Sequence, residues 1–161
     1  MAKAKRLTQV PGLGPSNAKG LPGVAFCRAV NKSGGALTAG MLLVLETSAA
    51  NWAAGKPVPV TTTTTANNQK VCGAVPAGSP SIPDGATFVM QIAGLHTALL
   101  VDGTTDLTAG DYLNTSTTAG AAAKVSTTLA IIGWYVDADY TTNAVAGKKC
   151  FLKNLQGLTP D

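Results

Sequence analysis

The sequence predicts an all-β fold: a compact β-barrel or β-tulip-like domain built from two related repeat halves, with an extended N-terminal arm. The first observation is composition, because the 161 residues include 18 glycines and 9 prolines, are rich in threonine, and are only 12% charged. Thr and Val favour pleated, half-buried strands, whereas Gly and Pro interrupt helices. The second observation is an internal repeat. Aromatic residues make up only 5% of the chain, so we expect a mainly aliphatic core.

The repeat has three anchors: the tetrapeptide Leu-Thr-Ala-Gly, a short apolar strand that carries a glycine, and a segment that begins with Phe and aligns without a gap. The anchors occur in one order, at residues 37–40, 71–73 and 88–95 and again at residues 107–110, 131–133 and 151–158. This order predicts a duplicated β-unit, with halves at about residues 35–95 and 105–158.

Residues 1–23 form the predicted arm, and residues 24–161 form the predicted single β domain. The arm is rich in proline and glycine, which fit neither a helix nor a central strand. Fully extended, it could reach about 75 Å. Such a segment is either disordered or lies along a partner, and composition leaves both interpretations open.

Strands are expected wherever apolar or β-branched residues cluster between turn signals. The continuous apolar run 41–45 predicts a strand that is covered on both faces. Two prolines in 56–60 predict an edge or irregular strand, and the threonines 61–65 fit either a strand or a loop. Residues 119–124 are too few for a stable helix. The other expected strands lie at residues 24–30, 87–93, 95–101, 111–113, 124–126, 131–137 and 150–155.

The two copies differ in length between their first two anchors. Gly40 and Gly73 are 33 positions apart, whereas Gly110 and Gly133 are 23 positions apart. We therefore expect ten additional residues in the first copy, as a longer loop within residues 52–65.

The chain offers few groups for catalysis or metal binding. His96 is the only histidine and lies among apolar residues, so we expect it to be a partly buried strand histidine. Asp137 and Asp139 alternate as a paired-carboxylate site would, but we favour a solvated strand end over such a site. No spacing matches a zinc or calcium site. The sequence therefore predicts no catalytic, cofactor-binding or metal site, no small-molecule substrate, and a protein that is not an enzyme.

Cysteine usage and hydropathy suggest a reducing compartment and no membrane partner. The three cysteines are odd in number and far apart, which does not predict a disulfide framework. The N-terminal basic residues are not followed by the apolar stretch of a secretory signal. No run approaches the roughly 18 apolar residues that a membrane span requires.

The positive charge of the chain lies near its N-terminus. Residues 1–45 hold six bases and no acid, while the remainder nets −2, for a total of +4. A basic arm can neutralise nucleic-acid phosphates or dock on an acidic protein surface. Only four bases precede Gly23 and no aromatic residue is interleaved for stacking, so we favour a protein partner over nucleic acid.

The large aromatic side chains are candidates for an interface. Trp134 and Tyr135 are neighbours in a predicted strand, so one should face the core and the other the surface. Rings of this kind bury much area and keep a polar tip, which suits an oligomer or partner interface as well as core packing. The candidates are Trp52, Trp134 and Tyr135.

The second copy contains a recognisable series of short motifs. An LTAGD turn at 107–111 opens a strand, a TAG…K hairpin follows at 118–124, and an Ile-Gly pair at 132–133 precedes the last strand. This series resembles the small decoration, or cement, proteins of tailed-bacteriophage heads. The first copy matches less closely, because Met41 replaces the aspartate and prolines interrupt its hairpin.

The resemblance implies a non-enzymatic virion protein, made in the host cytoplasm, on the capsid exterior. Such proteins bind the outer surface of an expanded capsid, often as trimers, and clamp neighbouring major capsid protein subunits. The alternatives are another virion part, such as a tail or head-surface adhesion module, or a small nucleic-acid-binding protein that uses the arm. On the capsid interpretation, the contact residues would be Lys3, Lys5, Arg6, Val10, Leu13 and Lys19.

Overall fold

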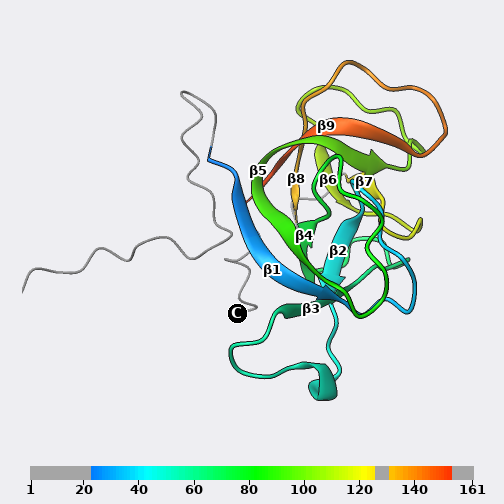
Figure 1. Ribbon diagram of the computed structural model, residues 1–161. Coiled ribbons are helices and arrows are strands. Elements are labelled where there is room, and N and C mark those ends of the chain that lie inside the picture. Colours follow the sequence, from blue (N-terminus) through cyan, green and yellow to red (C-terminus); the bar gives the residue numbers. More distant parts are fainter. Residues whose placement is uncertain (1–22, 126–130, 154–161) are drawn as a thin grey trace, which may run out of the picture.

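The computed structural model describes residues 23–125 and 131–153, which form an all-β structure with one short 3-10 helix, η1 (Ala49–Asn51) (Figure 1). None of the helical residues in these ranges forms a segment long and apolar enough to cross a membrane. The strands are β1 (Ala25–Asn31), β2 (Leu42–Leu45), β3 (Val58–Thr61), β4 (Val71–Ala74), β5 (Thr87–Val101), β6 (Tyr112–Thr115), β7 (Ala122–Lys124), β8 (Gly133–Tyr135) and β9 (Ala146–Leu152).

The strands close into two barrels that share β5. In the first unit (residues 25–93), β1 pairs with β3, β3 with β2, β2 with β4, β4 with β5, and β5 again with β1. In the second unit (residues 94–152), the same ring is made by β5, β7, β6, β8 and β9. The predicted all-β barrel is therefore confirmed, and the long strand β5 gives its first half to one ring and its second half to the other.

The pairing patterns of the two units correspond, although their β-bulges lie at different positions. Each unit contains one parallel pair, β1 with β3 or β5 with β7, and each Leu-Thr-Ala-Gly segment begins with a leucine in an isolated bridge. In each unit, residues that pair with one another across adjacent strands also form a row, and the two rows are equivalent. The first row is Leu42, Ala74, Gln91 and Phe26, and the second is Tyr112, Trp134, Phe151 and Leu95.

These registers correct the alignment of the last repeat anchor. Ala74 pairs with Gln91, and its counterpart Trp134 pairs with Phe151, so Gln91 is equivalent to Phe151. The gapless sequence alignment instead matched Phe88 to Phe151, which is three residues out of register. The sequence alignment was anchored on Phe88 and Phe151 and on the glycine that follows each of them, and matching single residues does not fix which strand positions pair.

Most of the additional length of the first copy lies in the connection from β2 to β3. Leu45 pairs with Val60, fifteen positions along the chain, whereas their counterparts Thr115 and Ala122 are seven positions apart. The additional residues therefore form the loop that contains η1, which extends away from the first barrel (Figure 1).

Two local expectations were wrong and one is now decided. Strand β3 is not an edge, because it lies between β1 and β2. Its Pro59 lacks an N–H but contributes a carbonyl that accepts the N–H of Glu46 at 3.0 Å. The threonine tract leaves β3 after Thr61 and continues as a loop. The strand predicted at residues 124–126 instead spans Ala122–Lys124, within the Ala-rich segment that resembled a helical turn.

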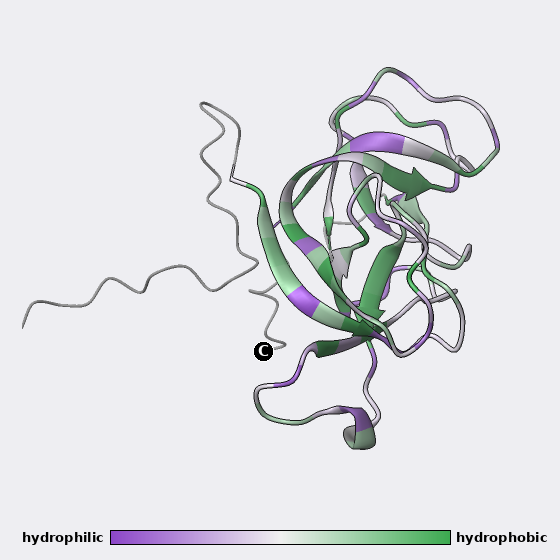
Figure 2. Cartoon of the chain, viewed as in Figure 1, coloured by the Kyte–Doolittle hydropathy of each residue, from purple (hydrophilic) through white to green (hydrophobic). Residues whose placement is uncertain are grey.

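Strand β2 connects the two apolar cores. Leu43 packs in the first barrel with Val60 and other residues, while Leu42 and Val44 belong to the cluster of the second unit with Leu99. All three β2 residues are buried, which confirms a strand covered on both faces. Figure 2 shows β2 as hydrophobic along its length. Burial of the outward face of β2 therefore depends on the second unit being in place.

Backbone hydrogen bonds join the units as well. The Leu100 N–H donates to the Gly40 carbonyl at 2.8 Å, and the Leu42 N–H donates to the Gly120 carbonyl at 2.7 Å. Gly40 has a φ of 82°, and a Cβ at this position would collide with the Ala98 carbonyl oxygen. The glycine of the first Leu-Thr-Ala-Gly segment thus permits the close approach of the two units.

We predict that Gly40→Ala and Gly110→Ala differ in stability, although both replace the glycine of a Leu-Thr-Ala-Gly segment. Gly110 has a φ of 98° and no atom within 4 Å of the place that a Cβ would take, so its substitution should cost about 1 kcal/mol for the left-handed backbone. Gly40→Ala should cost about 1–3 kcal/mol more, because the units must also separate. Urea unfolding of the two variants measures the difference, and equal losses would contradict the role of Gly40.

Candidate interaction surfaces

The predicted capsid-contact residues of the arm lie outside the described residues, so their role stays a prediction. The described residues do include the histidine, the cysteines, most of the carboxylates and the three aromatic candidates. The arm positions concerned are Lys3, Lys5, Arg6, Val10, Leu13 and Lys19.

His96 is a buried component of β5 with a structural role. Its side chain is fully buried, Nε2 donates to the Val75 carbonyl at 2.9 Å, and Nδ1 accepts the Ala98 N–H at 3.2 Å. A carbonyl can only accept, so the ring is neutral with its proton on Nε2. Burial lowers the pKa of His96 below its ordinary value. Both ring nitrogens of His96 thus make hydrogen bonds with backbone groups.

The thiols and carboxylates are similarly committed to structure. Burial raises the pKa of Cys72 and of Cys150 to about 12, so neither is a reactive thiolate. The Asp137 carboxylate accepts the backbone N–H groups of Lys149 and Ala138, each at 3.0 Å, which lowers its pKa and fixes the turn after β8. Within residues 23–125 and 131–153, no three His, Cys, Asp or Glu side chains group as metal ligands would.

Tyr135 is a core residue, and its assignment to an interface is corrected. Its side chain has no exposed surface, and the hydroxyl donates to the Ala138 carbonyl at 2.5 Å. Burial, reinforced by the nearby Asp137 charge, raises the pKa of Tyr135 to about 12. The expectation that Trp134 and Tyr135 face opposite sides of their strand is confirmed, because Trp134 lies half-buried on the outer face.

Trp134 belongs to an exposed aromatic row that crosses three strands. Its ring centroid lies 6.4 Å from Tyr112 on β6 and 6.1 Å from Phe151 on β9, with interplanar angles of 60° and 50°. Tilted rings at these distances attract one another beyond their area burial. Tyr112 is 40% exposed. We call Tyr112, Trp134 and Phe151 the aromatic row; only Trp134 was identified from sequence, because the row depends on how β6, β8 and β9 pair.

Trp52 lies in the longer loop between β2 and β3, with 46% of its surface exposed. Its indole N–H donates to the Glu46 carbonyl at 2.7 Å. The Glu46 carboxylate accepts the Ser48 N–H at 2.7 Å and the Asn51 side-chain amide, and these bonds lower its pKa. The loop thus holds one exposed indole in a defined position, which suits contact with another macromolecule.

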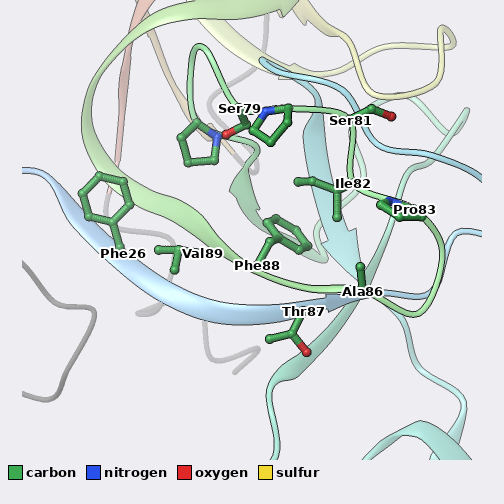
Figure 3. A pocket seen from close by; sticks show the side chains of 11 residues that line it. Phe26, Ser79, Ser81, Ile82, Pro83, Ala86, Thr87, Phe88 and Val89 are labelled. Atoms are coloured by element: carbon green, nitrogen blue, oxygen red, sulfur yellow. The ribbon is translucent and has the colours of Figure 1, made fainter.

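An apolar groove opens on the first unit beside β1 and β5, with a volume of about 560 Å³ (Figure 3). Phe26 from β1 and Phe88 and Val89 from β5 line one side, and the proline-rich segment 76–83 lines the other. Val89 is 39% exposed. We call this hollow the first-unit groove. It contains no charged lining residue, so it suits an apolar or aromatic side chain better than a polar ligand.

Comparisons with known proteins include a structural likeness. No family model and no curated protein matches the chain. The structure is similar to a crystal structure of the N base of head fiber gp8.5 in bacteriophage phi29, with a TM-score of 0.49 and 15% sequence identity. That match covers 81% of this chain and 95% of the other. A likeness of this size assigns neither a family nor a function.

We predict that His96 makes the protein less stable as the pH falls below 6.5. The unfolded chain then binds a proton at His96, with an ordinary pKa of 6.5, that the folded chain does not bind because its pKa is lower. The free energy of unfolding should fall by up to about 1.4 kcal/mol per pH unit. Urea unfolding between about pH 8 and about pH 5 measures this loss.

The control for this prediction is His96→Gln, whose amide can also donate to the Val75 carbonyl. The acids with lowered pKa, such as Glu46 and Asp137, have ordinary values of 4.5 and 3.8, so they affect stability only at lower pH. The variant should therefore lose the pH dependence in the histidine range. An unchanged slope in the variant would assign that dependence to another group.

Proposed function

We propose that this chain is a structural virion protein that binds the outer surface of an expanded phage capsid and stabilises it by clamping neighbouring major capsid protein subunits. Residues of the LTAGD series support this proposal through their resemblance to capsid decoration proteins. The protein acts on the capsid exterior after synthesis in the host cytoplasm. It associates with itself as a trimer and requires no small-molecule substrate.

The observation that carries the proposal is the separation of charge between arm and body. Residues 1–22 hold four bases and no acid, whereas residues 23–161 hold eight of each, so the whole net charge of +4 belongs to the arm. A neutral body with a basic extension suits a protein that attaches through the extension. The partner surface for such an arm is acidic, and the attraction weakens with added salt.

The pairing of the strands supports the same division. Each of the strands β1 to β9 pairs on both sides, so the described body has no open sheet edge to offer a partner. An extended arm can instead add as a strand to an edge of the coat protein, with main-chain hydrogen bonds that supply affinity. Many copies around one shell add avidity to this attachment.

A second candidate is a head-surface adhesion module, and the Trp52 loop favours it. The loop is held by the Glu46 contacts and presents an indole to solvent, as an adhesive tip would. In this case the arm attaches the protein to the head and the loop binds elsewhere. If labelled micrographs place the protein on phage tails, it is a tail module instead.

We predict that deleting residues 1–20 leaves a folded protein that no longer co-sediments with empty expanded shells. The full-length protein should bind expanded shells saturably, bind unexpanded shells weakly, and ignore free duplex DNA. Retained shell binding by the truncated protein would exclude the arm as the attachment. Binding to DNA alone, with steep salt dependence, would instead assign the arm to phosphate neutralisation.

A matched pair of charge variants tests the electrostatic part of the proposal. Changing the four arm bases to Gln should weaken shell binding at least about tenfold, if each contributes a few tenths of a kcal/mol. Changing four exposed lysines of the body removes the same charge and should leave binding within about twofold. Equal effects would show that net charge, not the arm, sets affinity. The body lysines are Lys32, Lys56, Lys70 and Lys153.

A further inference from the structure

The equivalent rows of the two units differ in what covers them. In the first unit, Leu42 and Ala74 are at most 1% exposed and Gln91 is 5% exposed, because the second unit packs over them. The Leu42 N–H reaches the Gly120 carbonyl of the second unit, and the Gln91 amide donates to the Leu95 carbonyl at 3.0 Å. A barrel of the same fold thus covers three members of this row, whereas the fourth member, Phe26, lines the first-unit groove.

The aromatic row occupies the same place on the second unit, where no further barrel covers it within the described residues. Tyr112 is 40% exposed, and Trp134 and Phe151 are half-buried. Three adjacent rings form a surface of the kind that marks protein–protein contacts. Because the equivalent row binds a barrel of this fold, the occupant that fits best is a barrel of the same kind.

A suitable barrel surface is present in the chain itself. The first-unit groove is apolar and open, and the exposed Val89 lies at its rim. Charged residues flank both surfaces, and Arg28 is exposed on β1 opposite Val89 of the groove. Lys149 is exposed on the same face of β9 as Phe151, and Asp84 is exposed next to Pro83 of the groove. Hydrophobic fit therefore favours contact between the row and the groove.

We propose that the aromatic row of one copy docks into the first-unit groove of a second copy of this chain. The contact is heterologous, since each copy offers one row and one groove, and repetition around an axis closes a ring. This inference rests on the self-association named in the proposed function and identifies its surfaces. In a closed trimer every row and every groove is occupied.

Two interface variants test the proposal without shells. The row variant, Tyr112→Ser with Trp134→Ser, has an intact groove; the groove variant, Val89→Lys, has an intact row. Each should lose self-association, with a dissociation constant raised about a hundredfold, as expected for central aromatic contacts. Trp52→Ser, which removes an exposed indole elsewhere, should assemble like the wild type. Light scattering coupled to size-exclusion chromatography measures the mass of each.

Mixing the two variants gives the decisive result. The row of the groove variant can still enter the groove of the row variant, so the mixture should form a heterodimer and stop there. A wild type that stays monomeric would overturn the proposal. A groove variant that assembles fully would overturn it too, because the rows would then meet one another or another surface.

Two further measurements keep the test independent of folding and of capsid binding. Far-ultraviolet circular dichroism checks the row variant, and Tyr112→Ser alone, which removes an exposed ring, repeats the test with less risk to the core. Deleting residues 1–20 should abolish shell binding but leave self-association intact. If the full-length wild-type protein does not bind shells but the two interface variants still form a heterodimer, the proposed capsid function is rejected and the proposed self-association stands.

Discussion

Closure of two barrels by a single strand is the constraint on which the rest of the structure depends. Strand β5 has fifteen residues, and its two halves each complete a five-stranded ring. The strand changes barrels at Gly94, where φ is 90° and a Cβ would lie 2.7 Å from the Gly23 carbonyl oxygen. Only glycine fits this position, both for its backbone angle and for the approach of β1.

The shared strand also explains why the two units pack against each other. The second unit begins directly after Gly94, so its strands lie over the outward face of β2 and β4. Leu42 is apolar for this reason, whereas its counterpart Tyr112 is amphipathic and 40% exposed. The two units thus differ at this position, where only the first has a neighbouring barrel within the described residues.

Much of this fold could be predicted from local sequence, and the remainder required pairing information. The two-sided burial of β2 follows from its unbroken apolar run, and the continuity of β5 through Gly94 follows from apolar residues on both sides. The place of Pro59 could not be predicted, because a missing N–H is tolerated wherever that position bonds through its carbonyl. The predicted repeat register failed because it was anchored on single matching residues, Phe88 and Phe151, although a shift of three positions reverses the face of the strand on which each residue lies.

The interaction surfaces show the same limit. Trp134 was identifiable by its size, but Tyr112 and Phe151 became neighbours of it only through the order β6–β8–β9. Tyr135 is as large as Tyr112, yet it faces the core because side chains alternate along β8. No sequence pattern indicated the first-unit groove, which three separated segments build together.

The attachment of β1 has a mechanical consequence. Any force applied through the arm enters the body at β1, which pairs with β5 from Ala25 to Val30 and with β3 from Ala29 to Asn31. Tension along a strand loads its flanking hydrogen bonds together, in shear, whereas tension across a strand opens them one after another. A pull directed along β1 would therefore be shared by its hydrogen bonds to β5 and to β3 before any single bond fails.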